Sequence, residues 1–64
     1  MKLGWIARDI DKSLYVFYGS KPFLMNGGER WNNEECLYID LPSDSFPEVT
    51  FENSPKQIEI KLID

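Results

Sequence analysis

The sequence predicts a small all-β fold, either an antiparallel meander or an open barrel of five to six short strands. Three observations predict it. Short apolar or alternating runs recur along the chain and are separated by turn-forming residues. β-branched and aromatic side chains, which pack well on a pleated surface, are concentrated in these runs. Nothing in the chain supports a long helix, a repeat or a low-complexity tail.

The chain has 64 residues, so we expect one small β domain over residues 1–64. A domain of this size buries only about 60% of the surface of its unfolded chain, and its stability is marginal. One cysteine and no histidine exclude an intrachain disulfide and make a zinc site very unfavourable. The core must therefore come from packing, to which nine aromatic residues contribute.

The first two strands, over 3–8 and 13–18, are joined by a tight turn over 9–12. A strand directs successive side chains to opposite faces, and both faces of the first strand carry apolar residues. We therefore expect a sheet that is covered, at least partly, on both sides. Gly4 has no side chain, so a neighbouring group could lie close to it. In the first strand, Leu3, Trp5 and Ala7 are predicted on one face and Gly4, Ile6 and Arg8 on the other. In the second strand, Leu14, Val16 and Tyr18 are predicted on one face and Tyr15 and Phe17 on the other.

The middle of the chain predicts a third strand over 23–25 and a turn over 26–29, where Asn-Gly is a strong turn signal. Trp31 follows in an otherwise polar stretch. One interpretation is that Trp31 folds over the sheet as a lid on the core, because a small core needs every large ring. The other is that Trp31 is an exposed binding anchor, since tryptophan is enriched at binding hot spots.

The second half predicts three further strands. Residues 36–41 alternate, so Leu37, Ile39 and Leu41 are expected in the core. At most one short helical turn is expected near Ser43–Phe46, followed by a strand over 48–52 with Val49 and Phe51 inward. Residues 57–62 form the cleanest amphipathic strand, with Ile58, Ile60 and Leu62 on one face.

Few residues point to chemistry, and we predict no enzyme, no catalytic or cofactor-binding residue and no metal ligand. Cys36 has no histidine base, and a mid-strand cysteine is usually a small buried hydrophobe. The spacing of Asp9, Asp11 and Ser13 is similar to the start of a calcium loop, but Leu14 and Ser20 stand where that loop needs glycine and glutamate.

The net charge of −4 argues against nucleic acid as a partner, because such binders need clustered Lys and Arg. No segment approaches the roughly 20 apolar residues of a membrane helix, and no export signal precedes the first strand. With a single thiol, this predicts a cytoplasmic protein that does not bind membranes. Met1 is interpreted as a true start, and the chain as a complete small reading frame.

Several segments together resemble small uncharacterised proteins of gut-dwelling bacteria and their phages. The resemblance rests on W-I-A-R-D at residues 5–9, L-Y-V-F at 14–17 and F-P-E-V-T-F-E-N-S-P at 46–55, and it does not extend over residues 21–35. Phe51 stands where those proteins usually have tryptophan. No activity is established for that group, so the resemblance implies a compact β fold and a mobile-element context, and it transfers no catalytic residue.

The leading functional hypothesis is a non-enzymatic module that binds another, unidentified protein. The candidate contacts are the loop carrying Trp31 and an exposed edge strand with Ile58, Ile60 and Leu62, through which a monomer could also form a weak homodimer. A second hypothesis is an acidic inhibitor or nucleic-acid-mimicking decoy that binds a basic partner. A third is a small carboxylate-based metal binder that uses Asp9 and Asp11.

Overall fold

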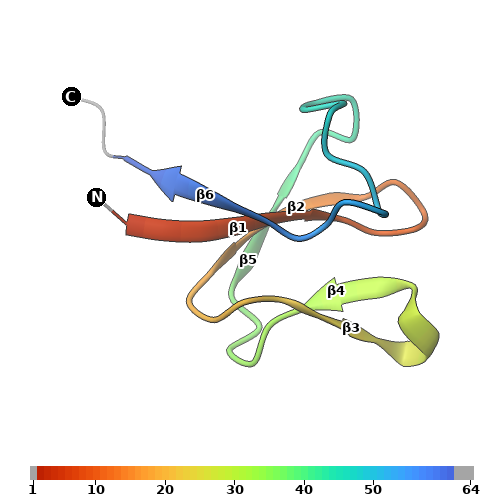
Figure 1. The fold of residues 1–64 in the computed structure, drawn as a ribbon, viewed down its shortest axis with the longest axis horizontal. Helices are drawn as coiled ribbons and strands as arrows, with labels where there is room; N and C mark the ends of the chain where they lie inside the picture. Colours follow the sequence, from red (N-terminus) through yellow and green to blue (C-terminus); the bar gives the residue numbers. More distant parts are fainter. Residues whose placement is uncertain (1, 62–64) are drawn as a thin grey trace.

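The computed structural model describes residues 2–61, and within them the regular structure is β apart from one 3₁₀ turn. The predicted antiparallel, mainly-β fold is confirmed (Figure 1). The elements are β1 (Lys2–Arg8), β2 (Leu14–Tyr18), β3 (Phe23–Met25), η1 (Asn26–Gly28), β4 (Arg30–Asn32), β5 (Tyr38–Leu41) and β6 (Lys56–Ile60).

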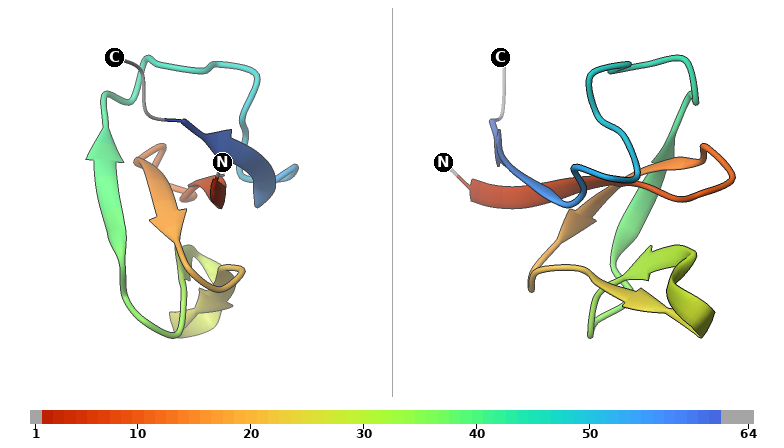
Figure 2. Two further views of the ribbon diagram at one scale, coloured as in Figure 1. Left: turned by 90° about the vertical axis from the view of Figure 1, so that its left-hand side faces the viewer. Right: turned by 45° about the vertical axis from the view of Figure 1, so that its right-hand side comes forward.

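Four strands form the main sheet in the order β5-β2-β1-β6, and β3 pairs with β4 in a separate two-stranded sheet. All pairings are antiparallel. Among the described residues the main sheet is open rather than closed into a barrel, so β5 and β6 are its two edges. Figure 2 shows this arrangement end-on, with β5 as the outermost strand on one side and β6 on the other.

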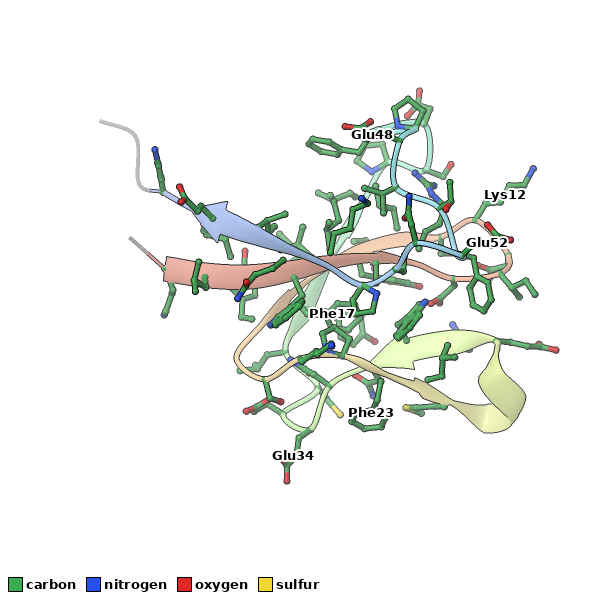
Figure 3. All side chains as sticks on the ribbon, in the orientation of Figure 1. Lys12, Phe17, Phe23, Glu34, Glu48 and Glu52 are labelled. Atoms are coloured by element: carbon green, nitrogen blue, oxygen red, sulfur yellow. The ribbon has the colours of Figure 1, made fainter. Side chains whose placement is uncertain are left out.

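The main sheet is covered on both faces, as its first strand predicts. On the core face, Ile6, Leu14 and Val16 pack against Val49 from the long segment between β5 and β6. On the opposite face, which we call the hairpin face, Ala7 and Phe17 are completely buried. Phe17 lies between the main sheet and the β3–β4 hairpin (Figure 3). The main sheet therefore lies between two thin layers, one formed by the segment that carries Val49 and the other by the β3–β4 hairpin.

Gly4 permits close packing between β1 and β6. A Cβ atom at this position would lie 2.5 Å from Cδ1 of Ile60 and 3.0 Å from the carbonyl oxygen of Phe17. A side chain here would force Ile60 to shift and would press against the Phe17 carbonyl, so the site favours glycine.

The predicted turn over residues 9–12 joins β1 to β2. The Lys12 N–H donates to the Asp9 carbonyl at 2.9 Å, and the Asp9 N–H donates to the Ser13 carbonyl at 2.8 Å. The Asp11 carboxylate accepts the Ser13 N–H at 3.0 Å, which is the local hydrogen bond that favours Asp in turns. Lys12 takes a positive φ of 79°.

The prediction for residues 36–41 is partly wrong. β5 begins only at Tyr38, and Leu37 and Ile39, which were expected in the core, are exposed. Ile39 does lie on the core face opposite Val16, but its side chain is half exposed there. Cys36 is exposed and has a φ of 56°, so it is a turn residue rather than a buried strand residue.

In the segment after β5, the structure satisfies the expectation of at most one short helical turn near Ser43–Phe46 and contradicts the expected strand over 48–52. Residues 43–46 form no helical turn: the Ser45 N–H donates to Pro42 and the Val49 N–H donates to Phe46, which makes two successive turns. Residues 48–52 form no strand, although Val49 is buried as predicted. Instead, the Asn53 side chain accepts the Thr50 N–H at 2.8 Å, and such local bonds compete with strand pairing.

Candidate functional site

The outer edge of β5 is the strongest candidate for a binding site. β5 pairs with β2 through Tyr38, Ile39, Asp40 and Leu41, and no other strand among residues 2–61 pairs with it. An edge strand has main-chain N–H and C=O groups without strand partners, which can pair with an added strand.

One hydrogen bond determines which β5 groups point outward. The Tyr18 N–H donates to the Leu37 carbonyl at 2.9 Å. In an antiparallel pair, hydrogen-bonded and non-hydrogen-bonded positions alternate, so Ile39 and Leu41 also direct their main-chain groups toward β2. Tyr38 and Asp40 therefore direct their N–H and C=O groups away from the sheet.

Apolar side chains accompany these outward main-chain groups. Leu37, Tyr38 and Ile39 are 54%, 46% and 49% exposed. Tyr38 rests on the hairpin face, with its ring 5.1 Å from Tyr15 in an edge-to-face arrangement and 5.5 Å from Phe17. The edge thus presents an aromatic side chain on one face and an aliphatic one on the other.

Asn33, a residue that the sequence reasoning missed, positions the start of β5. Its side chain is almost fully buried and its Nδ2 donates to the carbonyls of Tyr18 and Ser20 at 2.6 and 3.3 Å. Its Oδ1 accepts the Leu37 N–H at 3.1 Å. The Leu37 N–H and the Tyr18 carbonyl would otherwise bond to each other, and the Asn33 amide group bridges them instead. Together with the Tyr18 N–H to Leu37 carbonyl bond, this extends the β2–β5 ladder by one step.

Arg8, also missed, positions the segment that follows β5. Its buried guanidinium group directs all of its nitrogens to main-chain carbonyls and to no carboxylate. A guanidinium group has five N–H donors, and five carbonyl contacts match them. The acceptors are Val49 for Nε at 2.6 Å, Lys12 and Ser43 for Nη1 at 2.8 Å each, and Ser45 and Phe46 for Nη2 at 2.9 and 3.2 Å.

β6, the edge that the sequence singled out, has a different character. Continuing the same alternation through β2 and β1 places the outward main-chain groups of β6 at Gln57 and Glu59. Ile58 and Ile60 are partly buried against the core, and Leu62 lies outside the described residues. Lys56 and Lys61 flank this edge, and edge lysines oppose strand addition.

Trp31 lies in β4 rather than in a loop and is partly buried. Its ring packs 6.2 Å from Phe51, and its N–H main-chain group donates to the Asp9 carboxylate at 2.8 Å. The indole Nε1 is buried and lacks a hydrogen-bond partner. This partly buried placement favours the interpretation of Trp31 as a lid on the core over that of an exposed anchor.

A small cavity of about 150 Å³ lies beside Trp31. Its lining includes Tyr15, Tyr38 and the buried Asp9 carboxylate, which lies 3.6 Å from Arg30 Nε. Burial raises the pKa of Asp9 above its ordinary value, against the opposing effect of the Trp31 N–H. A hydrogen bond with Tyr15 and the charge of Asp9 raise the pKa of Arg30.

Asp9 and Asp11, the carboxylates of the third hypothesis, have different partners. Asp9 contacts Trp31 and Arg30, whereas Asp11 accepts the Ser13 N–H. Within residues 2–61 there is no group of three or more Asp, Glu, Cys or His side chains placed to hold a metal ion. The same residues include no helix that is long and apolar enough to cross a membrane.

Comparison of the chain with protein-family models, with curated proteins and with solved structures finds no match. What the protein binds must therefore be inferred from its own residues.

Proposed function

We propose that this protein is a non-enzymatic interaction module that binds an extended segment of another protein by strand addition at the β5 edge. The observation that supports it most strongly is the coincidence of outward main-chain groups at Tyr38 and Asp40 with the exposed side chains of Leu37 and Ile39. In strand addition, main-chain hydrogen bonds supply affinity and contacts with alternate side chains supply specificity. The β5 edge offers both.

We also propose that this module is located in the cytoplasm. Cys36 is an exposed, unpaired thiol, which suits the reducing environment of the cytoplasm. The mobile-element context suggested by the resemblance also remains a proposal.

The test uses a displayed library of random short peptides, from which binders to the folded protein are selected. Two matched proline variants then identify the edge. Asp40→Pro removes an outward N–H from β5, and Glu59→Pro removes an outward N–H from β6; proline is tolerated where the N–H faces solvent. We expect Asp40→Pro to abolish binding and Glu59→Pro to leave it unchanged. Failure to select any binder, or retained binding by folded Asp40→Pro, would refute the proposal.

An acidic inhibitor of a basic partner is the second candidate. The stretch from Trp31 to Pro55 contains no Lys or Arg, and its carboxylates are Glu34, Glu35, Asp40, Asp44, Glu48 and Glu52. However, Glu34, Glu48 and Glu52 project from separate corners of the molecule (Figure 3). A decoy needs its carboxylates on one face, so we rank it below strand addition. Competition between this protein and short duplex DNA for a basic protein would support the decoy.

A further inference from the structure

We infer that the strand which β5 accepts is basic, with Lys or Arg alternating with apolar residues along it. This inference rests on the proposed function, because it specifies the chemistry of the partner at the same edge. It is carried by the side chains on the two faces of β5 and by the charges at its two ends.

Along the sequence, the charged residues nearest to β5 are all acidic, while Arg30 lines a cavity with Tyr38 and Lys12 lines one with Asp44. Asp40 lies within the strand, Glu34 and Glu35 precede it, and Asp44 follows it. Among the described residues, none of these four carboxylates forms an ion pair; the ion pairs there join Arg30 to Asp9 and Lys61 to Glu59. Their charge is therefore available to a cation from outside.

Arg8, a buried cation that contacts the segment after β5, forms no ion pair with these carboxylates. All of its guanidinium nitrogens donate to main-chain carbonyls, including that of Ser43 just beyond β5. The hydrogen-bond donors of Arg8 are therefore already used by main-chain carbonyls. The four carboxylates of Glu34, Glu35, Asp40 and Asp44 belong to exposed residues.

The two faces of β5 call for different side chains on an added strand. On the hairpin face, Tyr38 and Asp40 present an aromatic ring and a carboxylate, both of which attract a cation. On the core face, Ile39 is half exposed and would be covered by an apolar side chain. Because side chains alternate along a strand, the matching partner alternates basic and apolar residues.

A second copy of this chain fits less well than a separate partner. Its β6 strand does alternate, with Ile58 and Ile60 on the core face. However, Glu59 would place a carboxylate on the same face as Asp40, and like charges on neighbouring strands are destabilising. We therefore commit to a basic segment of another protein.

The test compares two short synthetic peptides that share the same alternating valines. One carries Lys at the intervening positions and the other carries Glu. At low salt we expect the Lys peptide to bind about tenfold more tightly or better, because each exposed charge pair contributes roughly two- to fivefold. The preference should fall toward equality near 1 M salt, where the screening length is about 3 Å.

Two charge variants localise the effect with equal changes in net charge. Asp40→Asn should weaken binding of the Lys peptide about two- to fivefold. Glu59→Gln, at the outward position of the other edge, should leave it unchanged. An equal effect of both variants, or equal binding of both peptides, would overturn the inference.

The outcomes also separate this inference from the proposed function. If library-selected peptides bind in a way that Asp40→Pro abolishes but show no preference for Lys over Glu, strand addition stands and the basic partner is wrong. If no peptide of either kind binds, both are wrong. Concentration-dependent self-association that Asp40→Pro abolishes, without binding of the Lys peptide, would identify a second copy as the occupant and would also overturn the inference.

Discussion

Arg8 is a buried cation that organises main chain rather than pairing with an acid. Its contacts join the turn before β2, through Lys12, to the segment after β5, through Ser43 and Val49. The Arg8 N–H main-chain group also donates to Ser54 Oγ at 2.9 Å. One residue thereby connects three parts of the chain that are distant in sequence.

Replacement of Arg8 should destabilise the protein strongly. Lysine has three donors on a single nitrogen, so Arg8→Lys leaves buried carbonyls without partners. We expect a loss of about 2–4 kcal/mol in the free energy of unfolding, measured by urea denaturation, because hydrogen bonds to charged groups are worth roughly 1.5–3 kcal/mol. Lys61→Gln, at an exposed lysine, should change it by less than about 0.5 kcal/mol. Equal effects would contradict this role for Arg8.

Asp9 gives a prediction for the dependence of stability on pH. Burial raises its pKa above 3.8, so the folded protein holds the proton more tightly than the unfolded chain. The free energy of unfolding of the wild type should therefore fall, relative to that of Asp9→Asn, as pH rises from below 3.8 through the raised pKa toward neutrality. Urea denaturation over this range measures the difference.

Glu35 supplies a control of opposite sign. Hydrogen bonds from the Ser20 hydroxyl, at 2.7 Å, and the Ser20 N–H, at 3.2 Å, lower the pKa of Glu35. Its contribution to stability is present above the ordinary pKa of 4.5 and is lost as pH falls through the lowered value. The wild type should thus gain stability relative to Glu35→Gln as pH rises. Slopes of the same sign for both comparisons would refute these assignments.

At the scale of elements, Asn33 connects the β3–β4 hairpin to the main sheet. Asn33→Ala leaves the Tyr18 carbonyl and the Leu37 N–H without these partners. We expect a loss of about 2–4 kcal/mol in the free energy of unfolding, because an unsatisfied buried group costs roughly 1–3 kcal/mol.

Asn53 is the matched control for Asn33. Its side chain accepts the Thr50 N–H at 2.8 Å and donates to the Glu48 carbonyl at 2.9 Å, but it is exposed. Because water can replace these bonds, Asn53→Ala should cost less than about 1 kcal/mol. A larger loss for Asn53→Ala than for Asn33→Ala would show that the hairpin connection is unimportant.

Gly4 tests the packing of β1 against β6. Gly4→Ala should lower the free energy of unfolding by about 1–3 kcal/mol, because the added carbon overlaps with Ile60 and with the Phe17 carbonyl. Ile60→Val removes the Cδ1 atom that lies closest. In thermal or urea unfolding the double variant should therefore lose less than the sum of the two single losses. Additive losses would exclude the contact with Ile60 as the cause.

Local patterns predicted some elements well and others poorly. The arms of β1 and β2 alternate on both faces and are joined by Asp-rich turn residues, so local propensity and tertiary structure agree there. Residues 36–41 also alternate, but alternation indicates only which face a residue occupies. Whether Ile39 is buried depends on what covers that face, which is decided by distant segments.

The β5 edge was not singled out from the sequence for the same reason. Assigning Leu37 and Ile39 to the core left β6 as the favoured edge, whereas the sheet order has edges at both β5 and β6. The distribution of charge was a usable signal: no Lys or Arg occurs between Arg30 and Lys56. The roles of the Arg8 and Asn33 side chains could not be read locally, because their hydrogen-bond partners are up to 41 and 15 residues away.

At the scale of the whole molecule, the main sheet packs on both faces, and within residues 2–61 its two edge strands have no strand partner on their outer side. The two edges differ: β6 has flanking lysines and partly buried isoleucines, while β5 has half-exposed apolar side chains and neighbouring carboxylates. This difference is the basis for assigning recognition to β5.

Amide hydrogen exchange in the presence and absence of the Lys–Val peptide tests this assignment most directly. In the free protein, the Tyr38 and Asp40 amides should exchange quickly and the Ile39 amide slowly, because only Ile39 donates toward β2. With peptide bound, Tyr38 and Asp40 should become protected while Gln57 and Glu59 stay unchanged. Slow exchange of Tyr38 and Asp40 in the free protein, or protection that appears at Gln57 and Glu59 instead, would contradict recognition at β5.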